Sequence, residues 1–354
     1  MSIPTEQIGS IPRPRELLDG ITAFAAGTIN QEALDALTTQ AVRDSIKLLE
    51  ATGSPVITDG EQSKSSFATY PVHGLPNLAP DGIKIHFSDG HVRQLPRLTS
   101  GPFRYQTYAQ QYLIEAQKYA HVPVKQAVIA ASALSLLYPQ DGIAGYPKED
   151  FLHDLVNEAE ADIRRCLDQG AHCVQVDFTE GRLSVKLDPT RSLLKEFIKL
   201  NNRVLERFTA EERKKIGVHT CPGADKDSTH SADVDYSELL PDLFELKAGN
   251  FYIAMASEKD RRRVLEIIKE HSKPDQRIFI GVTDPINPHI ETPEEVKRQI
   301  LEAAEFIPAE RLGTTDDCGF APFGDDTSRS RQIALEKITN RVLGTALAGK
   351  ELEL

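Results

Sequence analysis

The sequence lacks long hydrophobic runs and a secretory leader, and it contains only four cysteines among 354 residues. No apolar run approaches the roughly 18 residues that cross a bilayer. The first residues have neither the basic start nor the apolar stretch of a signal peptide. Four cysteines are too few for a disulfide scaffold at this length, so we expect free thiols in a reducing compartment. The sequence therefore predicts a cytoplasmic protein without a membrane segment.

Positive charge is also scarce. Asp and Glu number 53 against 41 Lys and Arg, which gives a formal net charge of −12. Because an acidic surface repels phosphate backbones, we do not expect general nucleic-acid binding. The hydrophobic share of 40% and the charged share of 27% are ordinary for a globular protein that buries a large core. Whether the chain forms a homo-oligomer is left open.

The sequence does contain a regular alternation of short apolar runs and amphipathic helical stretches. The candidate strands are Gln7–Ser10, Val56–Gly60, Val124–Ala130, Cys173–Asp177, Ile216–Thr220, Phe251–Ala256, Ile278–Asp284 and Leu312–Asp316. The candidate helices lie at 32–50, 104–120, 150–169, 190–208, 236–247, 260–271, 293–305 and 329–347. Such repeated units predict an α/β fold, and their number fits a (β/α)8 TIM barrel better than a doubly wound sheet. No glycine-rich nucleotide-binding motif follows any strand, and we expect one domain over residues 1–354.

The connection after the second strand is much longer than the others. Within it, residues 86–93 read as a turn between two extended arms. We interpret Phe67–Leu98 as a β-hairpin excursion over one face of the barrel. It is either a decorative loop or a lid over the substrate.

Polar side chains collect where the predicted strands end, which is where barrel enzymes place their chemistry. These residues are Ser10, Asp59, Glu61, Asp177, Glu180, His219, Cys221, Glu258, Asp284, His289, Asp316, Asp317 and Cys318. His219 and Cys221 lie two apart at the end of one strand, so both can meet one ion. With Cys318 at the end of another strand they form a zinc ligand set that leaves one position open, as in catalytic sites. By contrast, Cys166 and Cys173 lie in apolar patterns and are expected in the core.

These motifs are in the order and spacing of a known family. The chain resembles the C-terminal catalytic barrel of cobalamin-independent methionine synthase, with its short MetE-like relatives and the fold shared with uroporphyrinogen decarboxylase (UROD). The resemblance runs from Ile8-Gly9-Ser10 through Asp59-Gly-Glu61, Gln175-Val-Asp177 and His219-Thr-Cys221 to Asp317-Cys318-Gly319. It implies that His219, Cys221 and Cys318 bind Zn²⁺, which activates the thiol of homocysteine. It also implies that Ile8, Gly9, Ser10, Glu61 and Asp177 hold the amino-acid part of that substrate.

The chain departs from the family pattern at several positions. Met255 stands where the family has a fourth zinc ligand, a glutamate, and Glu258 is the nearest replacement. The proton-donating histidine after the seventh strand is missing, and His289 falls three residues late. We therefore name His289, together with Asp177, as the candidate catalytic residues. The family's folate-binding segment reads Ile129-Ala-Ala-Ser-Ala-Leu134 here, and the chain has no tryptophan to stack on a pterin.

The sequence thus favours transfer of a methyl or alkyl group to a thiol. Homocysteine is the first candidate acceptor, methionine biosynthesis is the nearest named role, and the donor is unidentified. A close alternative is addition of the thiol to an epoxide, or the reverse C–S lyase reaction. A second alternative is a zinc hydrolase, in which water fills the open position.

Overall fold

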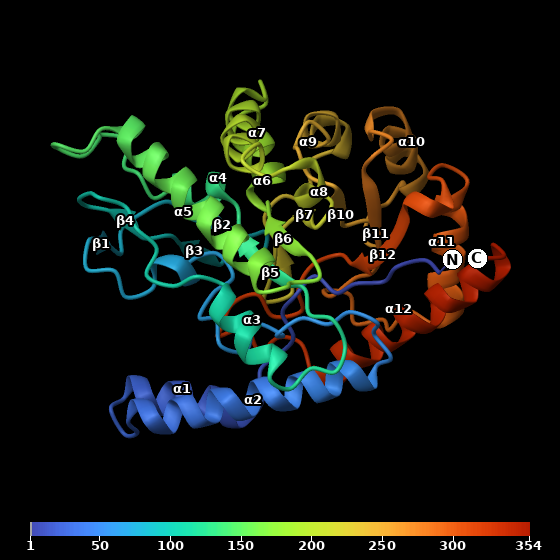
Figure 1. The fold of residues 1–354 in the computed structure, drawn as a ribbon, viewed down its shortest axis with the longest axis horizontal. Coiled ribbons are helices and arrows are strands. Elements are labelled where there is room, and N and C mark those ends of the chain that lie inside the picture. Colours follow the sequence, from blue (N-terminus) through green and yellow to red (C-terminus); the bar gives the residue numbers. More distant parts are fainter. Residues whose placement is uncertain (1) are drawn as a thin grey trace.

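The computed structural model describes residues 2–354 and places a parallel sheet at the centre of the chain (Figure 1). Six hydrogen-bonded strands follow the order β12-β11-β10-β7-β6-β5, and every neighbouring pair is parallel. They are β5 (Gln126–Ile129), β6 (Val174–Asp177), β7 (Ile216–Thr220), β10 (Asn250–Ile253), β11 (Arg277–Thr283) and β12 (Leu312–Asp316). Nearly every residue in them is buried, as expected for strands covered on both faces.

Two N-terminal segments complete the barrel without forming regular strands. Thr5 makes a parallel bridge to Thr314 of β12, and Ile57 makes one to Val124 just before β5. The two segments meet each other where the Thr58 hydroxyl donates to the Gly9 carbonyl at 2.8 Å. The predicted strands Gln7–Ser10 and Val56–Gly60 are therefore wrong as regular strands, because each N-terminal segment makes a single isolated backbone bridge and no continuous ladder.

Helices cover the outside of the barrel, with α7, α9 and α10 on one side and α1 and α2 on the opposite side (Figure 1). They are α1 (Arg15–Ala25), α2 (Gln31–Ala51), α3 (Gln110–Gln117), α4 (Ala131–Ser135), α5 (Lys148–Asp168), α6 (Glu180–Leu187), α7 (Ser192–Leu205), α8 (Ala210–Arg213), α9 (Leu240–Leu243), α10 (Arg261–His271), α11 (Pro293–Ala304) and α12 (Arg331–Glu351). Short 3₁₀ turns are η1 (Tyr70–Val72), η2 (Tyr236–Glu238) and η3 (Ala309–Arg311).

Two predicted helices are shorter than expected for identifiable reasons. The range 104–120 contains only α3, because side chains draw the preceding backbone into an extended course. The Phe103 amide donates to the Tyr146 hydroxyl, and the Tyr105 amide donates to Glu158. The range 236–247 divides into η2 and α9, whose first turn contains a proline. Four helices were not predicted from the sequence, α1, α4, α6 and α8, and of these α4 and α6 lie directly after β5 and β6.

Apolar packing fills both the barrel and the layer around it. The main core lies between the strands and the helices and includes Cys166. A smaller cluster of Ile8, Cys173, Tyr252 and Phe279 lies apart from it, with the two aromatic rings stacked 4.5 Å apart. The expected burial of Cys166 and Cys173 is confirmed.

The expected hairpin excursion is also confirmed. It consists of two small antiparallel ladders, β1 (Leu78–Ala79) with β4 (Arg97–Leu98) and β2 (Lys84–His86) with β3 (Val92–Gln94). Its turn contacts a second hairpin, β8 (Ala224–Asp225) with β9 (Ser228–Thr229), through a hydrogen bond from the Ser88 amide to the Thr229 carbonyl at 2.9 Å.

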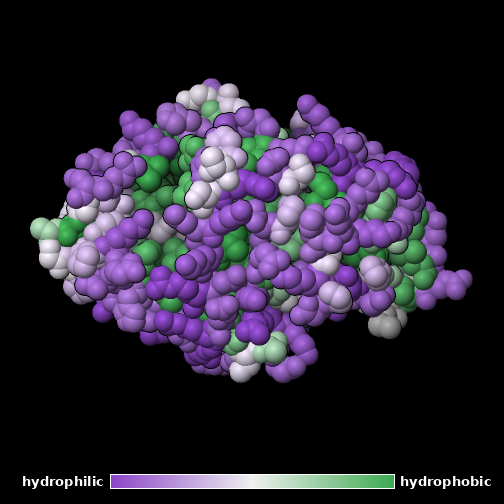
Figure 2. Space-filling model, turned by 90° about the horizontal axis from the view of Figure 1, so that it is seen from above, coloured by the Kyte–Doolittle hydropathy of each residue, from purple (hydrophilic) through white to green (hydrophobic). Residues whose placement is uncertain are grey.

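The face of the molecule seen in Figure 2 is mainly hydrophilic, with hydrophobic residues in scattered groups. Among residues 2–354, none of the helices has the length and apolar character needed to cross a membrane.

Candidate metal centre and substrate cavity

Three metal-binding side chains meet at the carboxyl ends of two strands. His219 is the penultimate residue of the strand β7, and Cys221 is the first residue after that strand. Because the two residues are two apart along an extended chain, both side chains point to the same side. Cys318 follows β12 by two residues. All three are buried, and their ligand atoms lie within 4.8 Å of one another. The two sulfurs are 3.0 Å apart and unbonded, since all four cysteines are free thiols.

The unmet bonding capacity of this cluster fits a metal ion. Neither ring nitrogen of His219 has a hydrogen-bond partner among the described residues, although the side chain is only 1% exposed. The Cys221 sulfur beside it and burial hold the pKa of the Cys318 thiol well above its usual range. A bound cation would satisfy the imidazole and stabilise both thiolates. The donor atoms of His219, Cys221 and Cys318 therefore fit a metal ion.

Asp317 fixes the loop that carries Cys318. Its carboxylate accepts hydrogen bonds from the amides of Met255 and Ala256, both at 2.7 Å, and of Ser257 at 2.8 Å. Burial, together with the charge of Asp284, raises its pKa to about 7. The Met255 side chain is packed in the main core. The end of β10 therefore supplies no carboxylate at the position where the resemblance expects a fourth ligand.

The structure does not bring Glu258 or His289 to the cluster. Arg182 draws the Glu258 carboxylate away in an ion pair of 2.8 Å, and both residues line a second cavity. The His289 side chain is 56% exposed and pairs with Glu295 at 3.1 Å. It lines a surface hollow apart from the metal ligands. Cys318 also lines the cavity of Glu258. The roles that the sequence suggested for Glu258 and His289 stay predictions, and in this structure each side chain pairs with a charged group instead.

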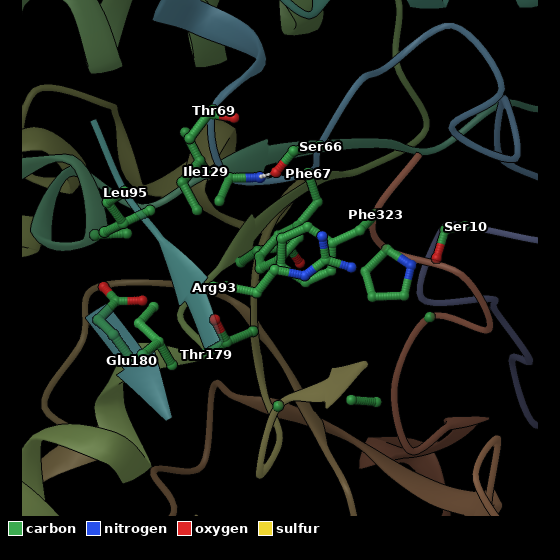
Figure 3. A pocket seen from close by; sticks show the side chains of 18 of the residues that line it. Ser10, Ser66, Phe67, Thr69, Arg93, Leu95, Ile129, Thr179, Glu180 and Phe323 are labelled. Atoms are coloured by element: carbon green, nitrogen blue, oxygen red, sulfur yellow. Dashed lines mark hydrogen bonds between the residues drawn. The ribbon is translucent and has the colours of Figure 1, made fainter. Parts of the chain in front are cut away.

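A cavity of about 350 Å³ opens beside the cluster, and Figure 3 shows this cavity from close by. His219 and Cys318 are part of its wall. Ile8, Gly9, Ser10, Glu61 and Asp177 all line it. The structure thus gathers every residue that the sequence named for substrate binding in one place. The rest of the wall is mainly apolar and comes from the segment after β5 and from the hairpin excursion.

Ser10 and Gly319 form one corner of this cavity. The Ser10 hydroxyl oxygen accepts from the Ala321 amide at 3.2 Å, so its own proton is free to donate. A Cβ atom at Gly319 would lie 2.2 Å from that oxygen. Only glycine therefore allows the loop after Cys318 to approach Ser10 this closely.

Two buried carboxyl groups, Glu61 and Asp177, stand on the same side of the cavity. Burial raises the pKa of Glu61 to about 7, against the opposing charge of Lys64 and with the help of Asp177 and Asp59. Burial also raises the pKa of Asp177, whose carboxylate accepts from Gln175 at 2.7 Å. Two acids held close in a low dielectric favour a cation between them.

Sequence reasoning missed Lys64, which lies behind these acids. Its ammonium group is 3.2 Å from Glu61 and donates to the Ala127 carbonyl at 2.9 Å. It also faces the Tyr70 ring at 4.7 Å. Nothing in the sequence distinguished this buried lysine from a surface one, because a pair with Glu61 three residues away is equally common on a surface and the contact with Ala127 comes from a distant segment.

Charged groups hold the hairpin excursion over the cavity. Arg93 of β3 pairs with Asp225 at 2.5 Å and with Asp325 at 2.9 Å. His91 also contacts Asp225, at 3.0 Å. Because Asp225 belongs to the loop that begins at Cys221, these ion pairs connect the hairpin excursion to the segment that carries a metal-ligand candidate.

A barrel with soft metal ligands and paired acids at one rim defines a class of enzyme that binds a polar substrate beside a metal ion. Residues 3–340 match the model of the cobalamin-independent synthase catalytic domain, and the chain belongs to this family. The family resemblance expected from the sequence is confirmed.

Individual relatives match the chain over nearly its whole length. The methionine synthase of Sulfolobus acidocaldarius is 26% identical, covering 99% of this chain and 94% of the relative. The structure of a B12-independent methionine synthase from Shewanella in complex with selenomethionine has a TM-score of 0.80 at 19% identity. It covers 100% of this chain and 99% of the other. A putative vitamin-B12-independent methionine synthase from Listeria monocytogenes has a TM-score of 0.70 at 20% identity, covering 98% of each chain. These likenesses confirm the barrel fold.

Proposed function

We propose that the protein transfers a methyl or other alkyl group to the thiol of a homocysteine-like substrate, at a Zn²⁺ ion held by His219, Cys221 and Cys318. One observation carries this proposal: soft metal ligands and a pair of buried acids share a single cavity. An amino acid that carries a thiol is the substrate class that both features suit. Family membership and the methionine synthases among the relatives support the same reaction.

The donor set favours zinc, because imidazole and thiolate are its preferred ligands. When bound there, zinc would keep the substrate thiol ionised at neutral pH and thus nucleophilic.

The chain's own residues would hold the amino-acid end of the substrate. The Ser10 hydroxyl is free to donate to the carboxylate, and Glu61 with Asp177 can accept from the ammonium group. Asp177 pairs in register with His219 on the adjacent strand. An amino group held by Asp177 would therefore lie one strand away from the metal, which suits a positioning role for this residue.

A thiol-alkylation assay tests the proposal. Zinc-loaded protein is mixed with homocysteine and iodomethane, and methionine formation is followed by mass spectrometry. We expect a rate well above that of the Cys318→Ser variant. Equal rates for the two proteins would overturn the proposal. Cleavage of an activated ester without any thiol would instead point to a hydrolase.

A further inference from the structure

The half of the cavity away from Ser10 has a different chemical character. In Figure 3, Glu180 and Thr179 lie with Leu95 and Ile129 on one side, and Ser10 lies on the other. Leu95 of the hairpin excursion and Ile129 lie on the side of Glu180 (Figure 3), and the segment after β5 adds Ala133, Leu134, Leu136 and Leu137 to the cavity wall. This apolar half takes no part in holding an amino acid, so it is free for a second reactant.

Glu180 is an acidic group in this half, and its hydrogen-bonding capacity is only partly used. It is 6% exposed and begins α6, directly after the Asp177 strand. The Ser132 hydroxyl donates to one carboxyl oxygen, and Asn201 donates to that hydroxyl at 2.7 Å. The other oxygen, Oε2, is buried without a hydrogen-bond partner among the described residues. Glu180 lines the cavity, so a fixed carboxyl group whose hydrogen-bonding capacity the described residues do not fill lies at the wall of this half.

The surroundings of Glu180 favour its neutral form. Burial raises its pKa to about 8, against the Ser132 hydrogen bond. Asp177 adds its negative charge to this effect, and no cationic side chain contributes. A protonated carboxyl group at neutral pH is a hydrogen-bond donor and an acid, as in enzymes that hold a carboxylic acid in an apolar site.

We propose that this apolar half takes an uncharged alkyl donor, and that the Glu180 carboxyl donates a proton to the atom released from the alkyl carbon. The proposal rests on the proposed function, since it needs the thiolate on the metal side. The thiolate sulfur bonds to the alkyl carbon, and the bond from that carbon to its oxygen or nitrogen breaks. The electron pair stays on that atom, which takes the Glu180 proton. Glu180 becomes a carboxylate and regains a proton from water.

The cavity argues against a polyanionic donor. Arg93 is the guanidinium group in its wall, and Asp225 and Asp325 already neutralise it. The Lys64 ammonium is taken by Glu61. The cavity volume of about 350 Å³ is also near the lower limit of about 300 Å³ for ligand pockets. A small donor attached through oxygen or nitrogen fits beside an amino acid, whereas a long polyglutamyl tail would find both of these described cations already paired.

Two alkylating probes separate this role from the thiol chemistry. Iodomethane releases iodide, which needs no proton, whereas 1,2-epoxypropane leaves an alkoxide that must be protonated. We expect Glu180→Gln to slow homocysteine alkylation by the epoxide by about 100-fold or more, the usual contribution of a general acid. Alkylation by iodomethane should change less than about 3-fold. With the epoxide, the wild-type rate should fall as the pH rises above about 8, and the Glu180→Gln variant should lack this fall.

Several readouts keep the test decisive. Zinc content and thermal unfolding show whether Glu180→Gln folds, and Ser132→Ala provides a milder second variant that should selectively slow the epoxide. Equal effects on both probes, or none, would overturn the role of Glu180 while leaving the proposed function intact. If neither probe reacts faster than with Cys318→Ser, the proposed function itself fails.

Discussion

The two halves of the cavity differ in origin and in chemistry. The half beside the metal site is polar and lies on the ends of barrel strands, with His219, Cys318 and Asp177 as its main groups. The other half is apolar and is built from the hairpin excursion and the segment after β5. Barrel strands hold side chains rigidly, whereas inserted loops can vary without disturbing the core. This division suggests a fixed thiol-binding half and a donor half that sets the reaction's specificity.

The largest expected effect is at the metal ligands. Cys318→Ser should lower zinc affinity by more than about 100-fold, because even residues that only support a ligand cost 10–100-fold. Alkylation of homocysteine should be lost with the metal. Elemental analysis after dialysis measures the zinc. Cys166→Ala is the matched control, because this buried thiol lies in the main core. Loss of zinc in the control as well would mean that the barrel itself had failed.

The next largest effect concerns the acids of the thiol half. Asp177→Asn should raise the homocysteine KM about 10- to 100-fold, the loss expected for a hydrogen bond to a charged group of about 1.5–3 kcal/mol. Zinc content should not change. Glu258→Gln serves as the control, since Glu258 pairs with Arg182 outside this cavity. A control that lost zinc would restore Glu258 as a ligand.

The pH dependence of homocysteine binding tests the second acid of the thiol half, Glu61. The pKa of Glu61 is about 7 in the free protein, so the group is charged above this pH and neutral below it. A bound ammonium group needs the charged form, and homocysteine should bind more weakly as the pH falls from 8 to 6. Calorimetry with 4-mercaptobutyrate, which lacks the amino group, corrects for ionisation of the thiol. The affinity ratio of the two thiols should fall with the pH, and a constant ratio would exclude Glu61 from ammonium binding.

A smaller effect, on local stability, is expected in the hairpin excursion that covers the donor half of the cavity. Asp225→Asn removes the buried charge that Arg93 and His91 share, so the turn at residues 87–91 should open more often. We expect amide hydrogen exchange there to be about 10-fold faster, which corresponds to about 1.4 kcal/mol of local stability. Asp81→Asn breaks only the exposed pair with Arg97 in the same excursion and should have little effect. Identical amide exchange rates in the two variants would show that the ion pairs of Asp225 do not hold the hairpin excursion in place.

The smallest effect is expected at His289. Because its side chain is exposed and pairs with Glu295 away from the cavity, His289→Ala should change kcat less than about 2-fold. Steady-state alkylation of homocysteine measures this. A large loss of kcat would return His289 to the acid role that the sequence suggested.

The same division explains what could be predicted from the sequence. The six strands from β5 to β12 are short apolar runs, and their polar ends pointed to His219, Cys221 and Cys318 directly. The two N-terminal segments of the barrel were predicted as regular strands, but the segments around Thr5 and Ile57 pair through single bridges that leave no periodic pattern. Hydrophobic periodicity reports burial, but it does not report which distant segment is the partner.

The identity of the tertiary partners also explains which features of the site could not be predicted from the sequence. Glu180 was visible as a polar residue after a strand, but its apolar wall and its bond to Ser132 depend on three separate segments. The Arg93–Asp225 pair joins residues 132 positions apart. The sequence could not show either that Glu258 pairs with Arg182 and His289 with Glu295. Tertiary contacts therefore settle which candidate side chains reach the cavity.

The most direct test of the account is X-ray absorption at the zinc edge, recorded for zinc-loaded protein with and without homocysteine. We predict that the free protein shows two sulfur scatterers, from Cys221 and Cys318, and that homocysteine adds a third. The Cys318→Ser variant, when loaded with zinc, should show one sulfur scatterer fewer than the wild-type protein before homocysteine is added. An unchanged sulfur count on adding homocysteine would contradict the central claim that this site binds and activates a thiol.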